Sequence, residues 1–253
     1  MKTNIKQFIC LLFFFYLFES CNTSTKVIKI EKSVIELNHT SETDTTFEKI
    51  VNPYKTKMDA IMNEILIVSD QELLKGLPES GLGNFVSDAV LKKANDKYKP
   101  TDEAPANICL LNNGGLRAQL PKGNITRGNV FELMPFENSI VILTLSGEKT
   151  KQLFESIIAI NGAPFSGATV KAKGKKMTEL KINNKDFDVT KTYKVATSDY
   201  LSSGGDKYDF LKNPIKTDTL NYLLRDAIID FLIEENKKGN TLKYVTDGRI
   251  KFE

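Results

Sequence analysis

The chain has 253 residues, of which 41% are hydrophobic and 26% are charged, and its formal net charge is +3 at pH 7. This composition is typical of a folded globular protein and excludes disorder along the whole length. The charge is nearly balanced, and no basic stripe with interleaved aromatic residues runs along the sequence. Nucleic acid is therefore excluded as the first choice of partner.

The first residues have the pattern of an export signal. Two lysines precede an apolar run from 8 to 18, which is shorter than the about twenty residues that a membrane-spanning helix needs. The run leads to Cys21 and resembles a bacterial lipoprotein signal, although Glu19 stands where a small residue is common. We expect residues 1–20 to be a signal peptide, Cys21 to carry a lipid, and the protein to be anchored in the bacterial cell envelope, facing the periplasm or the exterior. An ordinary cleaved signal peptide is the alternative.

Residues 21–48 are rich in Thr, Ser, Lys and Glu, and this composition predicts a tether with at most one added strand. The domain proper is expected at 49–253. Of the cysteines at 10, 21 and 109, the first should leave with the signal and the second should be acylated, so no disulfide framework is expected. Cys109 lies in an apolar run, where we expect a small buried hydrophobic residue rather than a nucleophile.

Regular structure is expected throughout the domain. Apolar residues at helical spacing predict helices from about 51, over 82–98, after Ser146, and over 217–238 with Gly239 as its stop. Short apolar runs predict strands at 65–69, 107–111, 140–145, 169–172, 177–182 and 193–197. Helices and strands are mixed without a strict βαβ rhythm, so the pattern predicts an α/β or mixed α+β domain and no particular topology.

Three motifs carry groups that suit a ligand. The run NNGGLR at 112–117 ends a predicted buried strand in two glycines and an arginine, which lets backbone approach a ligand and places a cation near its anion. The run YLSSGGD at 200–206 offers a ring that can stack on a base and a carboxylate that can accept ribose hydroxyls. Phe136, in the run PFEN, could supply a second ring. Each motif alone also fits an ordinary turn or a core residue.

Taken together with residues 79–84 and 247–250, these motifs resemble the C-terminal domain of the 5'-nucleotidase family from about Val51 to the end of the chain. The resemblance implies a layered domain with helices packed on mixed sheets, which holds a nucleoside between two aromatic rings. It also implies the ligand contacts: Asn112 and Arg117 on the nucleoside and its phosphate side, Phe136 and Tyr200 as the rings, and Asp206 on the ribose.

The chain departs from the family pattern in three places. Tyr200 stands where Phe is usual, and ahead of Glu79 the chain has Lys75 nearby instead of an arginine that touches the ligand in many relatives. Hydrolysis in the family uses two metal ions in a separate N-terminal domain built from His, Asp and Asn. This sequence has one histidine, His39, in the predicted tether, so no metal site and no cofactor are expected in this chain. A centre made of carboxylates alone is the weaker alternative.

The sequence thus predicts the nucleotide- or nucleoside-recognition half of a split 5'-nucleotidase, not catalytic by itself. We expect the divalent metals to belong to a separate metallophosphatase chain and the membrane contact to be the lipid on Cys21. Two alternatives stay open: a lipoprotein that binds nucleosides or nucleotides without chemistry, and a domain that serves another sulfur or phosphate ester.

Overall fold

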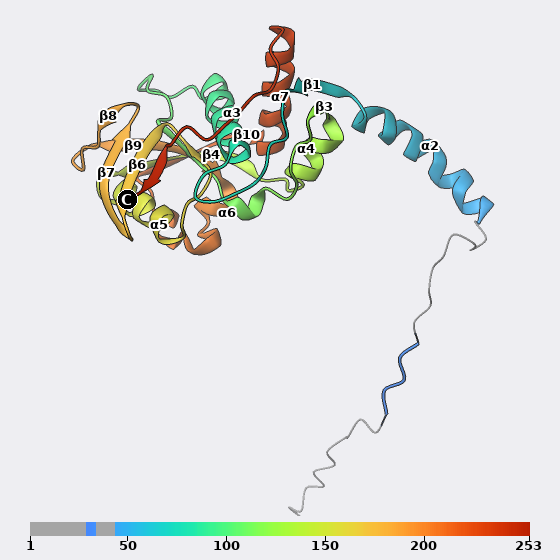
Figure 1. Cartoon of the computed structure of the whole chain (residues 1–253), viewed down its shortest axis with the longest axis horizontal. Helices are drawn as coiled ribbons and strands as arrows, with labels where there is room; N and C mark the ends of the chain where they lie inside the picture. Colours follow the sequence, from blue (N-terminus) through green and yellow to red (C-terminus); the bar gives the residue numbers. More distant parts are fainter. Residues whose placement is uncertain (1–28, 34–43) are drawn as a thin grey trace, which may run out of the picture. The chain divides into compact units, whose positions relative to one another are not determined.

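The computed structural model describes residues 29–33 and 44–253, so the predicted signal peptide, Cys21 and most of the tether lie outside the described residues. The chain divides into two units, 1–48 and 49–253, and the second contains the sheets (Figure 1). None of the helices in the described residues is both long and apolar enough to cross a bilayer.

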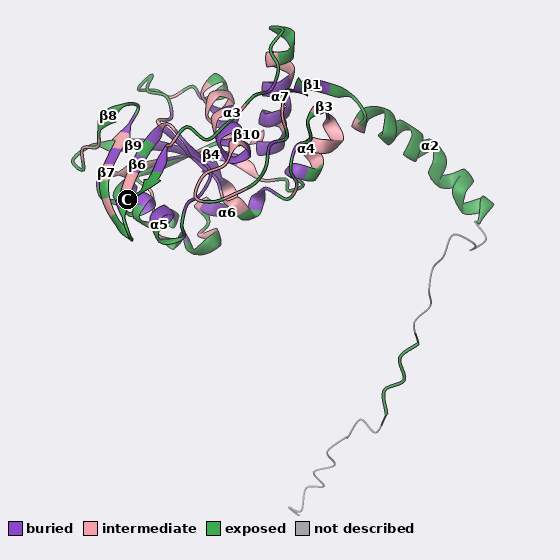
Figure 2. Ribbon diagram, viewed as in Figure 1, coloured by how far each residue is buried: buried purple, intermediate pink, exposed green. Residues whose placement is uncertain are grey.

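The predicted first helix is present as α2 (Thr45–Met62), and it begins earlier than the apolar spacing indicates. Its apolar stripe is not part of a core, because none of its residues is buried (Figure 2). Phe47 and Tyr54 are the most exposed of its large hydrophobic side chains. The apolar spacing therefore predicted the helix, but it did not predict that the apolar side chains would be exposed.

The domain contains three sheets. A five-stranded sheet has the order β10 (Lys216–Leu223), β4 (Ser139–Ser146), β9 (Thr192–Ser198), β2 (Ile108–Leu110) and β5 (Phe165–Ser166). A four-stranded sheet has the order β11 (Ile250–Phe252), β6 (Ala168–Lys173), β7 (Lys176–Ile182) and β8 (Lys185–Asp186). The strands β1 (Ile65–Ser69) and β3 (Gly123–Thr126) pair by themselves. Parallel pairs, β2 with β9 and β6 with β11, occur beside antiparallel ones, so both larger sheets are mixed, as expected.

The central strands β4, β9 and β2 of the five-stranded sheet are buried on both faces, whereas the edge strand β10 is not. Successive side chains of a strand point to opposite sides of the sheet, so each face packs against its own core. In β4, Ile140 and Ile142 belong to one hydrophobic cluster, and Val141 and Leu143 belong to the other. The first cluster includes residues of α3 (Gly81–Lys97), α4 (Arg127–Leu133) and α7 (Leu224–Lys237). The second includes residues of α5 (Gly147–Ala159), β6 and β7. Layers of helix and sheet thus enclose two cores.

Most of the predicted elements are confirmed, and one helix is wrong in part. The helix expected over 217–238 is wrong in its first part, because residues 217–223 belong to β10, which pairs antiparallel with β4; the helix begins only at Leu224. The spacing of Leu220, Leu223 and Leu224 fits either state, and the hydrogen-bonding edge of β4 decides between them. Gly239 follows the end of α7 with φ of 78°, the left-handed conformation expected of a helix stop.

Candidate functional site

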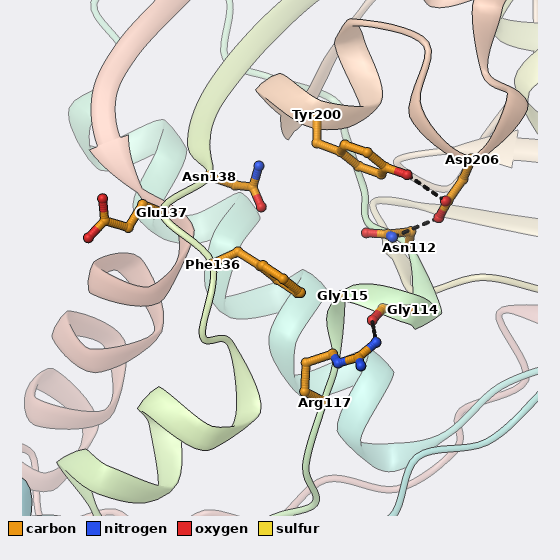
Figure 3. Close-up of a pocket in the computed structure, with 9 residues that line it drawn as sticks. All are labelled: Asn112, Gly114, Gly115, Arg117, Phe136, Glu137, Asn138, Tyr200 and Asp206. Atoms are coloured by element: carbon orange, nitrogen blue, oxygen red, sulfur yellow. Dashed lines mark hydrogen bonds between the residues drawn. The ribbon is translucent and has the colours of Figure 1, made fainter. Parts of the chain in front are cut away.

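One pocket of about 570 Å³ brings the five predicted ligand residues together (Figure 3). Its volume is in the range of small-molecule sites. It is lined by Asn112, Gly114, Gly115, Arg117, Phe136, Glu137, Asn138, Tyr200 and Asp206. The lining comes from three segments that are distant in sequence, so tertiary folding assembles the site. The role of each side chain toward a ligand stays a prediction.

Gly115 makes room for Asn112. After β2 the chain enters a short 3-10 turn, η1 (Asn113–Gly115), with Asn112 as its N-cap. A Cβ atom on Gly115 would lie 2.8 Å from Asn112 Oδ1, closer than real side chains allow. The turn also orients the arginine, because Arg117 Nη1 donates to the carbonyl of Gly114 at 3.3 Å.

Gly204 and Gly205 are needed for different structural reasons. Tyr200 lies in α6 (Asp199–Ser202), a short helix at the end of β9 that is capped by Ser198. Gly204 adopts φ of 89°, which glycine reaches without strain. The ring of Tyr200 lies against Gly205, where an added Cβ would be only 2.5 Å from ring atoms Cε1 and Cζ. The second glycine is therefore required by the position of the Tyr200 ring.

Asp206 joins the two motifs through its carboxylate. The residue lies in η2 (Gly205–Lys207) at φ of 50°, a conformation that Asp tolerates better than most residues. Its Oδ1 accepts from the Tyr200 hydroxyl at 2.8 Å and its Oδ2 accepts from Asn112 Nδ2 at 2.7 Å (Figure 3). The hydrogen bond to the carboxylate raises the pKa of the Tyr200 hydroxyl above its ordinary value. Each carboxylate oxygen keeps acceptor capacity for a ligand hydroxyl.

The two aromatic rings are partly open to solvent. Phe136 is 43% exposed and Tyr200 is 45% exposed, and Figure 3 shows both side chains directed into the same space from different segments. The guanidinium carbon of Arg117 lies 6.0 Å from the centroid of the Phe136 ring. Asn138 Nδ2 donates to Asp199 Oδ1 at 2.8 Å, which links the two segments that carry the rings. This arrangement can receive a flat aromatic group between the rings.

Sequence reasoning did not assign Glu137 and Asn138 to the site, although both belong to the PFEN run. Their proximity to Phe136 was the available signal, but polar residues of this kind are common in loops. Lys75 does not line the pocket; its Nζ donates to the carbonyl of Leu116 at 3.0 Å, beside Arg117.

The two remaining motifs, residues 79–84 and 247–250, stabilise the fold and do not line the pocket. The carboxylate of Glu79 accepts from Asn84 Nδ2 at 2.7 Å and from the backbone of 247–248. Arg249 pairs with Asp88, with Nη1 to Oδ1 at 2.9 Å, and with Asp247. These contacts fasten the C-terminal segment to the start of α3.

Cys109 is completely buried, as expected, and burial raises the pKa of its thiol. Among the described residues, no group of three or more His, Cys, Asp or Glu side chains lies close enough to hold a metal ion.

Three relatives show what the chain is similar to. It is 27% identical over 244 residues to the trifunctional nucleotide phosphoesterase protein YfkN of Bacillus subtilis (strain 168), covering 88% of this chain and 16% of that protein. It is 30% identical over 158 residues to protein UshA of Escherichia coli (strain K12), covering 60% and 28%. The crystal structure of the 5'-nucleotidase precursor from Thermus thermophilus superposes with a TM-score of 0.68 at 25% identity, covering 83% of this chain and 43% of that one. This chain spans less than half of each of these proteins.

The family model of the 5'-nucleotidase C-terminal domain matches residues 67–213, a range that contains all five predicted ligand residues. The match covers more than half of the chain, and the mixed α/β fold agrees with it. The chain therefore belongs to the family of the 5'-nucleotidase C-terminal domain.

Proposed function

We propose that this protein is the nucleotide- or nucleoside-recognition half of a 5'-nucleotidase whose hydrolytic half is a separate metallophosphatase chain. The observation that carries the proposal is the pocket, in which two half-exposed rings, a carboxylate and an arginine face one cavity. Family membership, and the names of relatives described as a nucleotide phosphoesterase and a 5'-nucleotidase, support the class of ligand.

The pocket suggests a role for each group. A base stacks between Phe136 and Tyr200, and the ribose hydroxyls donate to the carboxylate of Asp206. Asn112 contacts the nucleoside beside Asp206. The arginines that form ion pairs among the described residues are Arg127 and Arg249. The guanidinium of Arg117 is therefore free to pair with a phosphate.

The proposal places the metal chemistry outside the described domain. Hydrolysis by two metal ions needs clustered ligands that hold both ions and a bound hydroxide, and the described residues contain no such cluster. We propose that a metallophosphatase partner supplies the divalent ions. The lipid on Cys21 would hold the recognition domain at the bacterial envelope, on its periplasmic or outer side.

Calorimetric titration of the lipid-free mature chain tests the recognition role. We expect adenosine and AMP to bind, with UDP-glucose as a comparison for ligands that extend beyond the phosphate. Absence of binding by all three would contradict the assignment of the pocket.

A phosphate-release assay on the same sample tests whether recognition and hydrolysis belong to two separate chains. AMP should not be hydrolysed by the chain alone with added Mg²⁺, Mn²⁺ or Zn²⁺, and release should begin when the partner metallophosphatase is added. Turnover by the pure chain would show that it holds a catalytic metal site, and a failure of every candidate metallophosphatase to gain activity would refute the split arrangement.

A further inference from the structure

Arg225 is a buried cation in an unfavourable place. It lies in the first turn of α7 and is 7% exposed. A positive charge at a helix N-terminus is disfavoured by the helix dipole, and burial of a charge without an opposite charge is costly. Arg225 forms no ion pair within the part of the chain that the structure describes, where the paired arginines are Arg127 and Arg249. Its contacts must therefore offset these costs.

Those contacts lead to the loop that carries Phe136. Arg225 Nη1 donates to the carbonyls of Pro135, at 3.3 Å, and Met134, at 3.5 Å. The guanidinium carbon lies 4.1 Å from the centroid of the Phe131 ring, within the range of a cation–π contact. Nε has no hydrogen-bond partner among the described residues, and the two carbonyls and the ring are the stabilising contacts that the described residues give the guanidinium.

The start of α7 holds the loop at both ends. Arg225 binds the two carbonyls that immediately precede Phe136, and the backbone amide of Leu224 donates to the carbonyl of Asn138 at 2.9 Å. The ring of Phe136 itself is 43% exposed, so packing around the ring fixes it only in part. Its position over the pocket therefore depends on the backbone on either side.

We propose that Arg225 is a positioning residue for the pocket, which fixes the segment from Met134 to Asn138 and thereby the ring of Phe136. The inference rests on the proposed function in one respect, namely that the ring of Phe136 stacks on a ligand. The mechanical part, that Arg225 orders the loop, can be measured without any ligand.

The chain contains no tryptophan, so Phe136→Trp places a single fluorescent reporter on the loop. In that background we compare Arg225→Met, which removes the donors and the charge, with Arg225→Lys, which keeps a charged donor. Arg249→Met is the matched control, because Arg249 is equally buried at 8% and contacts Asp88 and Asp247 instead of the loop. Steady-state anisotropy and acrylamide quenching report the mobility and exposure of the indole.

We expect Arg225→Met to lower the anisotropy and increase the quenching, Arg225→Lys to do so less, and Arg249→Met to leave both unchanged. An unchanged indole in Arg225→Met, or an equal change in Arg249→Met, would overturn the inference. If Arg225→Met does not fold, Arg225→Lys against the parent carries the same comparison, and an unchanged indole there overturns it too.

A double-mutant cycle tests the consequence for binding. Adenosine should bind Arg225→Met roughly two- to twelvefold more weakly than the wild type, the range expected when one side chain must be ordered on binding. In a Phe136→Ala background the same substitution should cause no further loss, because the two residues act as one unit. Equal losses in both backgrounds would overturn the positioning role. Absence of binding of adenosine, AMP and UDP-glucose by the wild type would refute the proposed function, and the fluorescence result would still decide whether Arg225 orders the loop.

Discussion

The contact between Tyr200 and Gly205 allows one substitution to displace a proposed stacking ring while leaving its chemistry in place. In Gly205→Ala, the new methyl group would lie 2.5 Å from two atoms of the ring, so the ring must move. Tyr200 is 45% exposed and can swing into solvent, so we expect the domain to stay folded. The movement would also break the 2.8 Å hydrogen bond from the Tyr200 hydroxyl to Asp206.

The expected effect on ligand binding follows from the loss of one stacking partner. Stacking of a base on an aromatic side chain contributes about 1–3 kcal/mol, so the Kd for adenosine should rise roughly fivefold to 150-fold. Calorimetric titration measures this change, and the Tm of the same samples reports whether the fold is intact.

Gly76→Ala is the matched control, because its new Cβ would meet its nearest neighbour, Ser80 Cβ, at an ordinary 3.6 Å. That variant should bind adenosine like the wild type. If Gly205→Ala also binds with unchanged affinity, the ring of Tyr200 in its observed position does not stack on the base. A large fall in Tm with Gly205→Ala would instead show that the ring cannot move away, contrary to the reasoning from its exposure.

Three further outcomes are expected. Asp206→Asn, which tolerates the local φ of 50°, should weaken binding of ribose-bearing ligands by about 1 kcal/mol, the difference between a charged and a neutral hydrogen bond, and calorimetry should show free adenine almost unaffected. Hydrogen bonds from Lys238 and from two lysines of α3 lower the pKa of Glu234, so its contribution to stability is complete above its ordinary pKa of 4.5 and declines as the pH falls further. Glu234→Gln should therefore lower the Tm at pH 7, and this deficit in Tm should shrink below about pH 4. A deficit that is constant with pH would contradict this reasoning. Cys21→Ser should move the protein from the membrane to the soluble fraction and remove the lipid mass, and continued membrane association would refute the anchor.

The spacing of apolar residues was sufficient to predict an element where that spacing agrees with a single type of secondary structure. The helix α3 was predicted because its apolar residues recur at helical spacing, and its Ser80 N-cap accepts from the amide of Gly83. The strand β2 was predicted because a short apolar run between turn residues fits a strand buried on both faces. The five predicted ligand residues were chosen because the motifs that contain them resemble those of the family in their order and spacing along the chain.

Tertiary contacts decided the structure and the burial of segments for which the spacing of apolar residues is ambiguous. The residues of β10 fit a helix or a strand, and the available edge of β4 made them a strand. The apolar stripe of α2 is present in the sequence, but its exposure depends on what packs against it, which spacing does not encode.

The same division applies to the pocket. The sequence by itself predicted five residues that line the pocket, since the residue types in its motifs limit the chemistry, but it did not assign Glu137 and Asn138. Only the tertiary structure decided that Asp206 bridges Tyr200 and Asn112, that the ring lies on Gly205, and that Arg225 holds the neighbouring loop. Asn112 and Asp206 are 94 residues apart, and the loop and Arg225 are about as distant. Hydrogen bonds at such separations depend on how the sheets and helices pack, because no local backbone rule brings their partners together.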